Sequence, residues 1–401
     1  MRNLFKITCL VLITLNSLNA QRKEVYLKSF DVNKQTIATI NLQNISVSIE
    51  ESFDDRIYFD YSIEFTDYSK KEIDDLLKKI EVDASLLNNY LTLRASSESK
   101  MTVSSFELKS SDRNGIGVVY EDSGLKNKKT NINKENVIKR KSKESVILEI
   151  NKNEVKNIEN ILSSFRQFEA SGKQKEINVN DVKYKRSHFI VKIPSYVKLI
   201  VLGDNSNIEL NPIFENVLEV TIENSSFRAN ELLNPKNKIK IEKGNFMVKK
   251  INGGDYILNS ISNGLIGSIS ESKITSEFSK IEIGEIGKNN SITDFNGKLW
   301  FYDFSTEFKN FSLKSEYSKV HLFYPTTDFG LRIMANNAVN VTIFSKNGNS
   351  TGGESRVDSP YVLMDRKAKR IGDFSGDMNL EMDNGFTFLY EENFESNKEN
   401  D

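Results

Sequence analysis

The sequence predicts a mainly β protein whose central part is a β-solenoid, with coils of about 19–20 residues and two strands per coil. Three observations favour this fold class. A short phrase, one or two small or polar residues and then an apolar, any, apolar triplet, recurs from 206 to 322. A second, weaker apolar track lies about half a period after each phrase. Sustained helical spacing is rare over the same stretch.

The phrase recurs at an even spacing. Its first apolar residues, which are 19, 19, 19, 16, 18 and 21 residues apart, are Ile208, Phe227, Phe246, Leu265, Ile281, Leu299 and Val320. Units this short cannot bury an apolar face alone and must stack on their neighbours. Stacking would place Phe246 on Phe227, and Leu265 on Phe246, about 4.8 Å apart. An antiparallel meander of hairpins is the alternative, and the even spacing favours the coil.

The first 20 residues have the pattern of a signal peptide. Arg2 and Lys6 precede or open an apolar run over 7–15, and a small and polar cleavage region follows. A retained membrane anchor is the alternative, although the run is too short to cross a bilayer. The only cysteine, Cys9, would be removed, so no disulfide, thiolate nucleophile or cysteine metal site is expected. We therefore expect an exported protein, periplasmic by default, with the cell surface and secretion as alternatives.

Residues 21–95 are expected to form a β-β-α-β cap. Ser69 caps a helix that runs through Ile80, and Glu72 completes a capping box. Strict alternation predicts a strand pair before this helix and one strand after it, at 45–49, 57–63 and 91–93.

Residues 96–185 form a polar, charged insert. Its segment 126–143 has eight Lys or Arg against one acid. The basic residues that stand out there are Lys126, Lys128, Lys129, Lys139, Arg140, Lys141 and Lys143. Such a run is typical of a solvated, mobile loop, and a docking site for an anionic polymer is the functional alternative. Within the insert, 155–168 has the apolar spacing of a short helix.

The coils are expected to fill 186–390. Pro194 ends the strand that leads into them, because proline cannot donate a ladder hydrogen bond. Beyond Leu322 the register is expected to continue in chain order through weaker segments and a final strand, at 341–343, 361–363, 378–380 and 386–390. Residues 391–401 are acidic and are expected to be disordered.

The order of these elements resembles a bacterial family known as putative adhesins, which are exported single-stranded β-solenoid proteins of unassigned function. The resemblance rests on the strand pair within 45–63, the helix 69–80, the extended segment 90–93, the proline-ended strand 191–194 and the Asn- or Gly-marked corners. It implies a solenoid and supplies no catalytic residues. The long insert is a departure from the family pattern.

Chemistry-bearing residues are sparse. The two histidines are His188 and His321, and the latter occupies the outward, middle position of a phrase. The outward positions carry a mixed set, namely Glu209, Arg228, Met247, Ile266, Glu282, Trp300 and His321. No acidic ladder or calcium-binding repeat is present, so we expect no cofactor, no metal site and no enzyme activity. A polysaccharide-degrading β-helix enzyme is the distant alternative.

Trp300 and Tyr302 are the candidate binding residues. They face outward if Leu299 and Phe301 face the core, and exposed aromatic rings can stack on sugars or bury in a protein partner. Burial beneath the insert or a terminal helix is the structural alternative. With 55 basic and 56 acidic residues, no net field favours nucleic acid. The sequence therefore favours a non-enzymatic envelope scaffold or protein-binding surface, and the rival is a carbohydrate-binding or adhesin-like protein.

Overall fold

A computed structural model describes residues 21–101, 104–108, 116–121, 140–141, 146–151, 182–325, 329–336, 339–344, 350–351, 361–367 and 376–390. Several sequence predictions lie outside these residues: the signal peptide, the helix at 155–168, the acidic tail and most of the basic run. The described parts of the insert are strands. No helix in the described part of the chain is long and apolar enough to cross a membrane.

The described chain is mainly β, as predicted, with the single helix α2 (Lys70–Leu77). The strands before the stack are β1 (Gln21–Asp31), β2 (Ile37–Glu51), β3 (Arg56–Thr66), β4 (Ile80–Leu87), β5 (Tyr90–Met101), β6 (Ser104–Leu108), β7 (Ile116–Glu121), β8 (Arg140–Lys141), β9 (Val146–Asn151) and β10 (Val182–Ile193). Those that follow are β11 (Lys198–Asp204), β12 (Asn207–Phe214), β13 (Leu218–Leu232), β14 (Lys238–Asn252), β15 (Asp255–Ser270), β16 (Lys273–Glu277), β17 (Lys280–Ile286), β18 (Asn290–Phe295), β19 (Lys298–Phe304), β20 (Asn310–Phe323), β21 (Phe329–Asn336), β22 (Val339–Phe344), β23 (Ser350–Thr351), β24 (Tyr361–Lys367) and β25 (Gly376–Tyr390).

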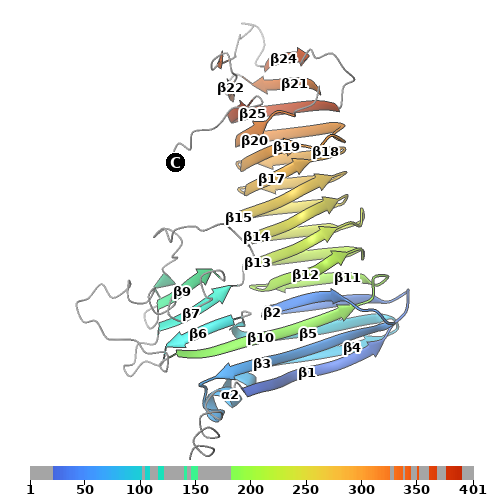
Figure 1. Ribbon diagram of the computed structural model, residues 1–401, viewed down its shortest axis with the longest axis vertical. Helices are drawn as coiled ribbons and strands as arrows, with labels where there is room; N and C mark the ends of the chain where they lie inside the picture. Colours follow the sequence, from blue (N-terminus) through green and yellow to red (C-terminus); the bar gives the residue numbers. More distant parts are fainter. Residues whose placement is uncertain are drawn as a thin grey trace, which may run out of the picture.

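The N-terminal strands form the base of an elongated molecule (Figure 1). Strand β3 pairs antiparallel with β1 and β10, while β2 pairs parallel with β5 and β10. The predicted capping box is present: the Glu72 amide donates to the Ser69 hydroxyl, and the Glu72 carboxylate accepts from the Ser69 amide. Hydrogen bonds from Lys183 and Ser69 lower the pKa of Glu72 to about 2. The helix ends at Leu77 and not at Ile80, because Ile80 starts β4 against β5.

Above this base, β2, β11–β22 and β25 build a parallel stack, whereas β23 and β24 pair antiparallel with β22 and β21 (Figure 1). Each layer pairs in register with the next, so that Ile208 lies beside Phe227 and Phe227 beside Phe246. The rings of Phe227 and Phe246 stack with centroids 5.7 Å apart. Parallel pairing excludes the antiparallel meander for this part of the chain.

Each layer has two strand segments that meet at a left-handed corner. The corner residues lie in register and all have φ between 49° and 60°: Asn44, Asn205, Asn224, Lys243, Ser260, Phe278, Asn296, Tyr317 and Asn384. Asparagine is the commonest of them because its short polar side chain tolerates this conformation. The asparagines that mark corners in the sequence therefore lie where the backbone adopts the left-handed conformation.

A buried serine follows the corner in several layers. The Ser225 hydroxyl donates to the Glu223 carbonyl at 2.6 Å and accepts from the Ser206 amide of the layer before at 2.9 Å. The equivalent Ser279 hydroxyl donates to Glu277 and accepts from the Ile261 amide. This column satisfies backbone groups that the bend would otherwise leave unpaired in the core.

One predicted register position is wrong. Gly264, and not Leu265, lies beside Phe246, because the ladder shifts by one residue between Gly244 and Asn245. Leu265 is consequently half-buried on the outward side, and Ile266 faces the core. Glycine suits this inward position, since a Cβ at Gly264 would lie 3.1 Å from the side chain of Ile281 in the next layer.

The last layers do not follow chain order as predicted. Strand β25 pairs directly with β20, and β21 and β22 pair with the opposite side of β25 (Figure 1). Asn384 thereby continues the corner column after Tyr317. The pairing of β25 with β20 depends on matched corners and on inward residues such as Met378 and Leu380, which are buried. Chain order alone does not specify this pairing.

Asp294 is a carboxylate buried in the core, with 2% of its surface exposed. It accepts hydrogen bonds from the hydroxyls of Ser276 and Ser318 and from the amide of Gly297. Burial raises its pKa, and the hydrogen bonds only partly oppose this effect. The folded state therefore binds this proton more tightly than the unfolded chain, whose carboxyl has an ordinary pKa near 3.8. The resulting stabilisation is complete below that value and is lost as the pH rises through the folded-state pKa.

We expect Asp294→Asn to be more stable than the parent at pH 7. An amide can accept from Ser318 and Gly297 through its oxygen and donate to Ser276 through its nitrogen, without any ionisation penalty. The melting temperatures of both proteins, recorded at pH 7 and pH 4, check this expectation. The difference between the two melting temperatures should be smaller at pH 4 than at pH 7. An equal difference at both pH values would contradict this expectation.

Candidate functional site

One face of the stack carries the candidate site. It consists of the outward side chains on the segment that follows each corner, and we call it the binding face. Its first column runs through paired residues of successive layers: Ser48, Glu209, Arg228, Met247, Leu265, Glu282, Trp300, His321 and Phe388. The predicted orientation of Trp300 and Tyr302 is confirmed, since Leu299 and Phe301 are buried and Tyr302 is 46% exposed.

Aromatic rings stack along this face in two parallel columns, which together form the aromatic ladder. In the first column the Trp300 and His321 rings are 5.1 Å apart and inclined by 1°, and His321 and Phe388 are 4.7 Å apart. The second column contains Tyr302, Phe323, Tyr390 and Phe344, with successive ring centroids 5.9, 4.5 and 4.9 Å apart. Such nearly parallel rings at these separations are offset-stacked.

The ladder is electrically neutral at its centre. The Nδ1 atom of His321 lies 2.8 Å from the Tyr390 hydroxyl. Burial, and secondly the charge of Lys319, lower the pKa of His321 to about 4. The imidazole is therefore uncharged at neutral pH and belongs to the stacked rings, where the sequence indicated only an isolated surface histidine.

Polar groups border the ladder at its Trp300 end. The Tyr302 hydroxyl donates to the Glu282 carboxylate at 3.0 Å, and Lys280 also binds Glu282, at 2.8 Å. Burial and Glu282 together raise the pKa of Tyr302 to about 12. The Lys280 ammonium lies 5.3 Å from the centre of the Trp300 ring. These contacts hold both predicted aromatic residues in fixed orientations.

A groove begins where the second column of rings ends. Next to Tyr302, the corresponding positions in the two preceding layers are Gly284 and Gly267, so no side chain continues the column. The resulting hollow has a volume of about 480 Å³. Tyr302 lines one end of it and Arg228 the other. Phe323 stacks on one side of the Tyr302 ring, in the direction of β20, and the groove lies on the opposite side.

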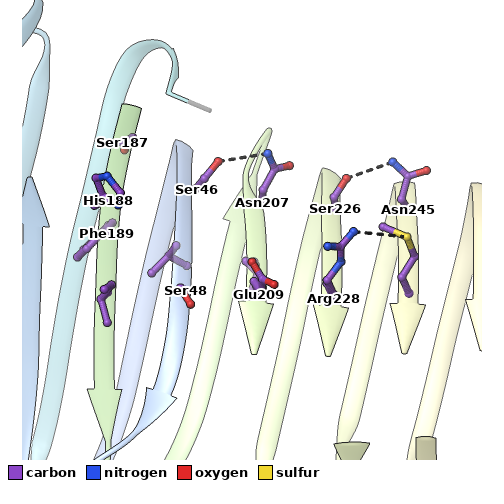
Figure 2. Close-up of a pocket in the computed structure, with 14 residues that line it drawn as sticks. Ser46, Ser48, Ser187, His188, Phe189, Asn207, Glu209, Ser226, Arg228 and Asn245 are labelled. Atoms are coloured by element: carbon purple, nitrogen blue, oxygen red, sulfur yellow. Dashed lines mark hydrogen bonds between the residues drawn. The ribbon is translucent and has the colours of Figure 1, made fainter. Parts of the chain in front are cut away.

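A second hollow of about 210 Å³ continues the groove toward the base of the stack, and the two share Glu209, Arg228 and Met247. Figure 2 shows its side chains in two rows, with Asn207 in the upper row and Glu209 and Arg228 in the lower one. The Asn207 amide donates to the Ser46 hydroxyl at 3.2 Å.

Arg228 is the unusual residue of this hollow. The residue is half-buried, and its guanidinium contacts the Met247 sulfur at 3.9 Å. Desolvation lowers its pKa, against the opposing charge of Glu209. Sequence reasoning placed Arg228 outward and assigned no role to it. His188 also lines the hollow, with its Nε2 atom 3.6 Å from a carboxylate oxygen of Glu64.

Within the described residues, no group of three or more His, Cys, Asp or Glu could hold a metal ion. Of the predicted basic residues, Arg140 and Lys141 form strand β8, which pairs with β9 and takes no part in the binding face. The other basic residues of that run lie outside the described ranges.

No family model and no curated protein matches the sequence. Among solved structures, the chain is similar to a crystal structure of a putative cell adhesion protein from Clostridium sporogenes ATCC 15579, with 12% identity over 93% of this chain and 100% of that chain, and a TM-score of 0.21. It is also similar to a putative adhesin from Bacteroides fragilis NCTC 9343, with 9% identity over 75% of this chain and 97% of that chain, and a TM-score of 0.26.

Proposed function

We propose that this protein is an exported, non-enzymatic β-solenoid that binds glycans along its binding face. The observation that carries the proposal is the aromatic ladder ending at the open side of Tyr302. A sugar ring has an apolar face and a polar rim. It can therefore stack on an aromatic ring while its hydroxyls bind the polar groups around it.

The geometry of the groove supports this function. A sugar placed over Gly267 and Gly284 would extend the column of stacked rings by one or two positions. Its hydroxyls would lie among polar residues that line the hollow, including Glu282 and Lys249. The volume of about 480 Å³ lies in the range usual for small-molecule sites.

A protein-binding scaffold is the second candidate, and a different surface favours it. Large aromatic residues in edge-to-face contact form a ridge along the corners: Phe278, Phe295 and Tyr317, which are 56%, 36% and 55% exposed. Phe278 and Tyr317 also have left-handed backbone conformations, which are costly for bulky residues. This ridge lies outside the groove and gives the control for the following experiment.

We expect Tyr302→Ala to weaken glycan binding about 10-fold, or about 1.4 kcal/mol, because it removes the stacking wall of the groove. The purified protein is first applied to an array of bacterial and host glycans, and the best ligand is then titrated calorimetrically. Tyr317→Ala, which removes an equally exposed ring from the ridge, should leave the affinity unchanged. Equal affinities of both variants, or retention of no glycan by the parent, would contradict the proposal.

A further inference from the structure

The hollow next to Arg228 contains an unmet hydrogen-bond donor. A guanidinium has five N–H donors in a planar fork that matches a carboxylate or a sulfate. Among the described residues, no carboxylate lies within ion-pairing distance of Arg228, and the thioether of Met247 is a weak acceptor. Because the side chain is half-buried, water replaces these interactions only in part.

An unmet acceptor lies on the same surface. The side-chain oxygen of Asn207 is buried and has no hydrogen-bond partner in the described part of the chain. The Asn207 amide nitrogen donates to the Ser46 hydroxyl, and the Asn245 amide nitrogen donates to the Ser226 hydroxyl. The row of hydrogen-bonded side chains is therefore interrupted between Asn207 and Ser226 (Figure 2). Arg228 comes two residues after Ser226 on that face. A half-buried donor, Arg228, and a buried acceptor without a partner, Asn207, thus line the same hollow on adjacent strands.

The two hollows form one continuous path along the stack. Arg228 lies on β13 and Tyr302 on β19, with β14, β15 and β17 between them. Four strand steps correspond to about 19 Å. A chain of several sugar residues can therefore reach from the open side of Tyr302 to Arg228, past the side chains of Met247, Lys249, Leu265 and Glu282, which line the hollow between them.

We propose that the hollow at Arg228 binds an anionic substituent, a carboxylate or a sulfate, on a sugar residue of the glycan, so that the ligand is an acidic polysaccharide. Arg228 binds two oxygens of the anion through its fork, and the Asn207 oxygen accepts a hydroxyl of the same or the neighbouring sugar. Glu209, the neighbour of Arg228 in the column, limits the positive potential there. This inference rests on the proposed glycan binding.

Matched probes test the charge requirement. The purified protein is titrated with a galacturonic acid oligomer and its methyl ester, and with a sulfated oligosaccharide and its desulfated form. The parent should bind at least one charged probe about 10-fold more tightly than its neutral counterpart. A preference for the galacturonic acid oligomer identifies a carboxylate as the bound group, and a preference for the sulfated oligosaccharide identifies a sulfate. Equal binding of charged and neutral forms would overturn this inference and leave glycan binding intact. Binding of no probe, together with an empty glycan array, would overturn both.

Four variants connect the preference to named residues. Arg228→Gln should abolish the preference for the charged probe while the neutral probe binds as before, and Arg228→Lys should restore it only in part, because an ammonium lacks the fork. Glu209→Gln should tighten binding of the charged probe, because it removes a like charge. Tyr302→Ala should weaken both probes equally. Melting temperatures of all variants show that they are folded, and unchanged selectivity in folded Arg228→Gln would refute the proposal.

Discussion

Phe246→Asp is expected to lower the free energy of unfolding by at least about 5 kcal/mol and to leave little folded protein. Phe246 is fully buried, stacks on Phe227 and packs at 6.0 Å from the ring of Tyr256. The substitution removes this packing, leaves a cavity and places a carboxylate in an apolar layer. Since the free energy of unfolding of folded domains is about 5–15 kcal/mol, one such substitution removes most of it. The midpoint of urea denaturation, followed by circular dichroism, measures the loss.

Thr221→Asp is the matched control for this substitution. It introduces the same aspartate one layer earlier, at an exposed position in the outward row. Its denaturation midpoint should stay close to that of the parent, because surface substitutions usually change stability by about 0.5 kcal/mol or less. A Phe246→Asp protein that unfolds at the parental midpoint would show that the inward column is assigned incorrectly.

The inward column illustrates how far the repeat pattern determines the register. The 19-residue spacing correctly predicts that Phe227 lies beside Ile208 and Phe246 beside Phe227. It fails at the next layer, where apolar residues occupy both outward and inward positions and Leu265 looks equivalent to Phe246. Alternation cannot distinguish the two faces when both are apolar. In the structure, the one-residue shift between Gly244 and Asn245 places Gly264 in the inward position.

The aromatic ladder was only partly predictable for a different reason. Trp300 and Tyr302 follow from alternation within one strand, because Leu299 and Phe301 are apolar neighbours. Phe388 could not be placed beside them, since β25 comes into contact with β20 across a long sequence separation and out of chain order. Long-range pairing of this kind leaves no local signal.

The sequence contains a weak indication of the groove. Gly267, Gly284 and Tyr302 are separated by 17 and 18 residues, close to the repeat period. Outward glycines in line with an outward aromatic residue indicate a gap in a column of side chains. Arg228 gave no such signal, because an outward arginine in a repeat is usually a solvated charge. Its burial depends on the neighbouring layers and is visible only in three dimensions.

Gly244→Ser is expected to destabilise the protein by about 1–3 kcal/mol, although the repeat pattern favours serine at this position. Serine follows the left-handed corner at Ser206, Ser225 and two later layers, and Gly244 pairs directly with Ser225. A Cβ on Gly244 would lie 1.8 Å from the Ser225 carbonyl oxygen, which is a backbone atom and cannot move without disturbing the ladder. The strain therefore exceeds the benefit of a hydroxyl that caps the corner. Urea denaturation midpoints of the variant and the parent provide the measurement.

The adjacent substitution Lys243→Asn separates this clash from a general intolerance of the corner. Lys243 has φ of 56°, and asparagine occupies the equivalent position in most layers, including Asn224. Asparagine adopts this conformation more readily than lysine, and the lost ion pair to Glu223 lies at the surface and contributes little. Lys243→Asn should therefore match the parent within about 0.5 kcal/mol or exceed it slightly. If Gly244→Ser proved equally harmless, the close approach of the two layers at this corner would be wrong.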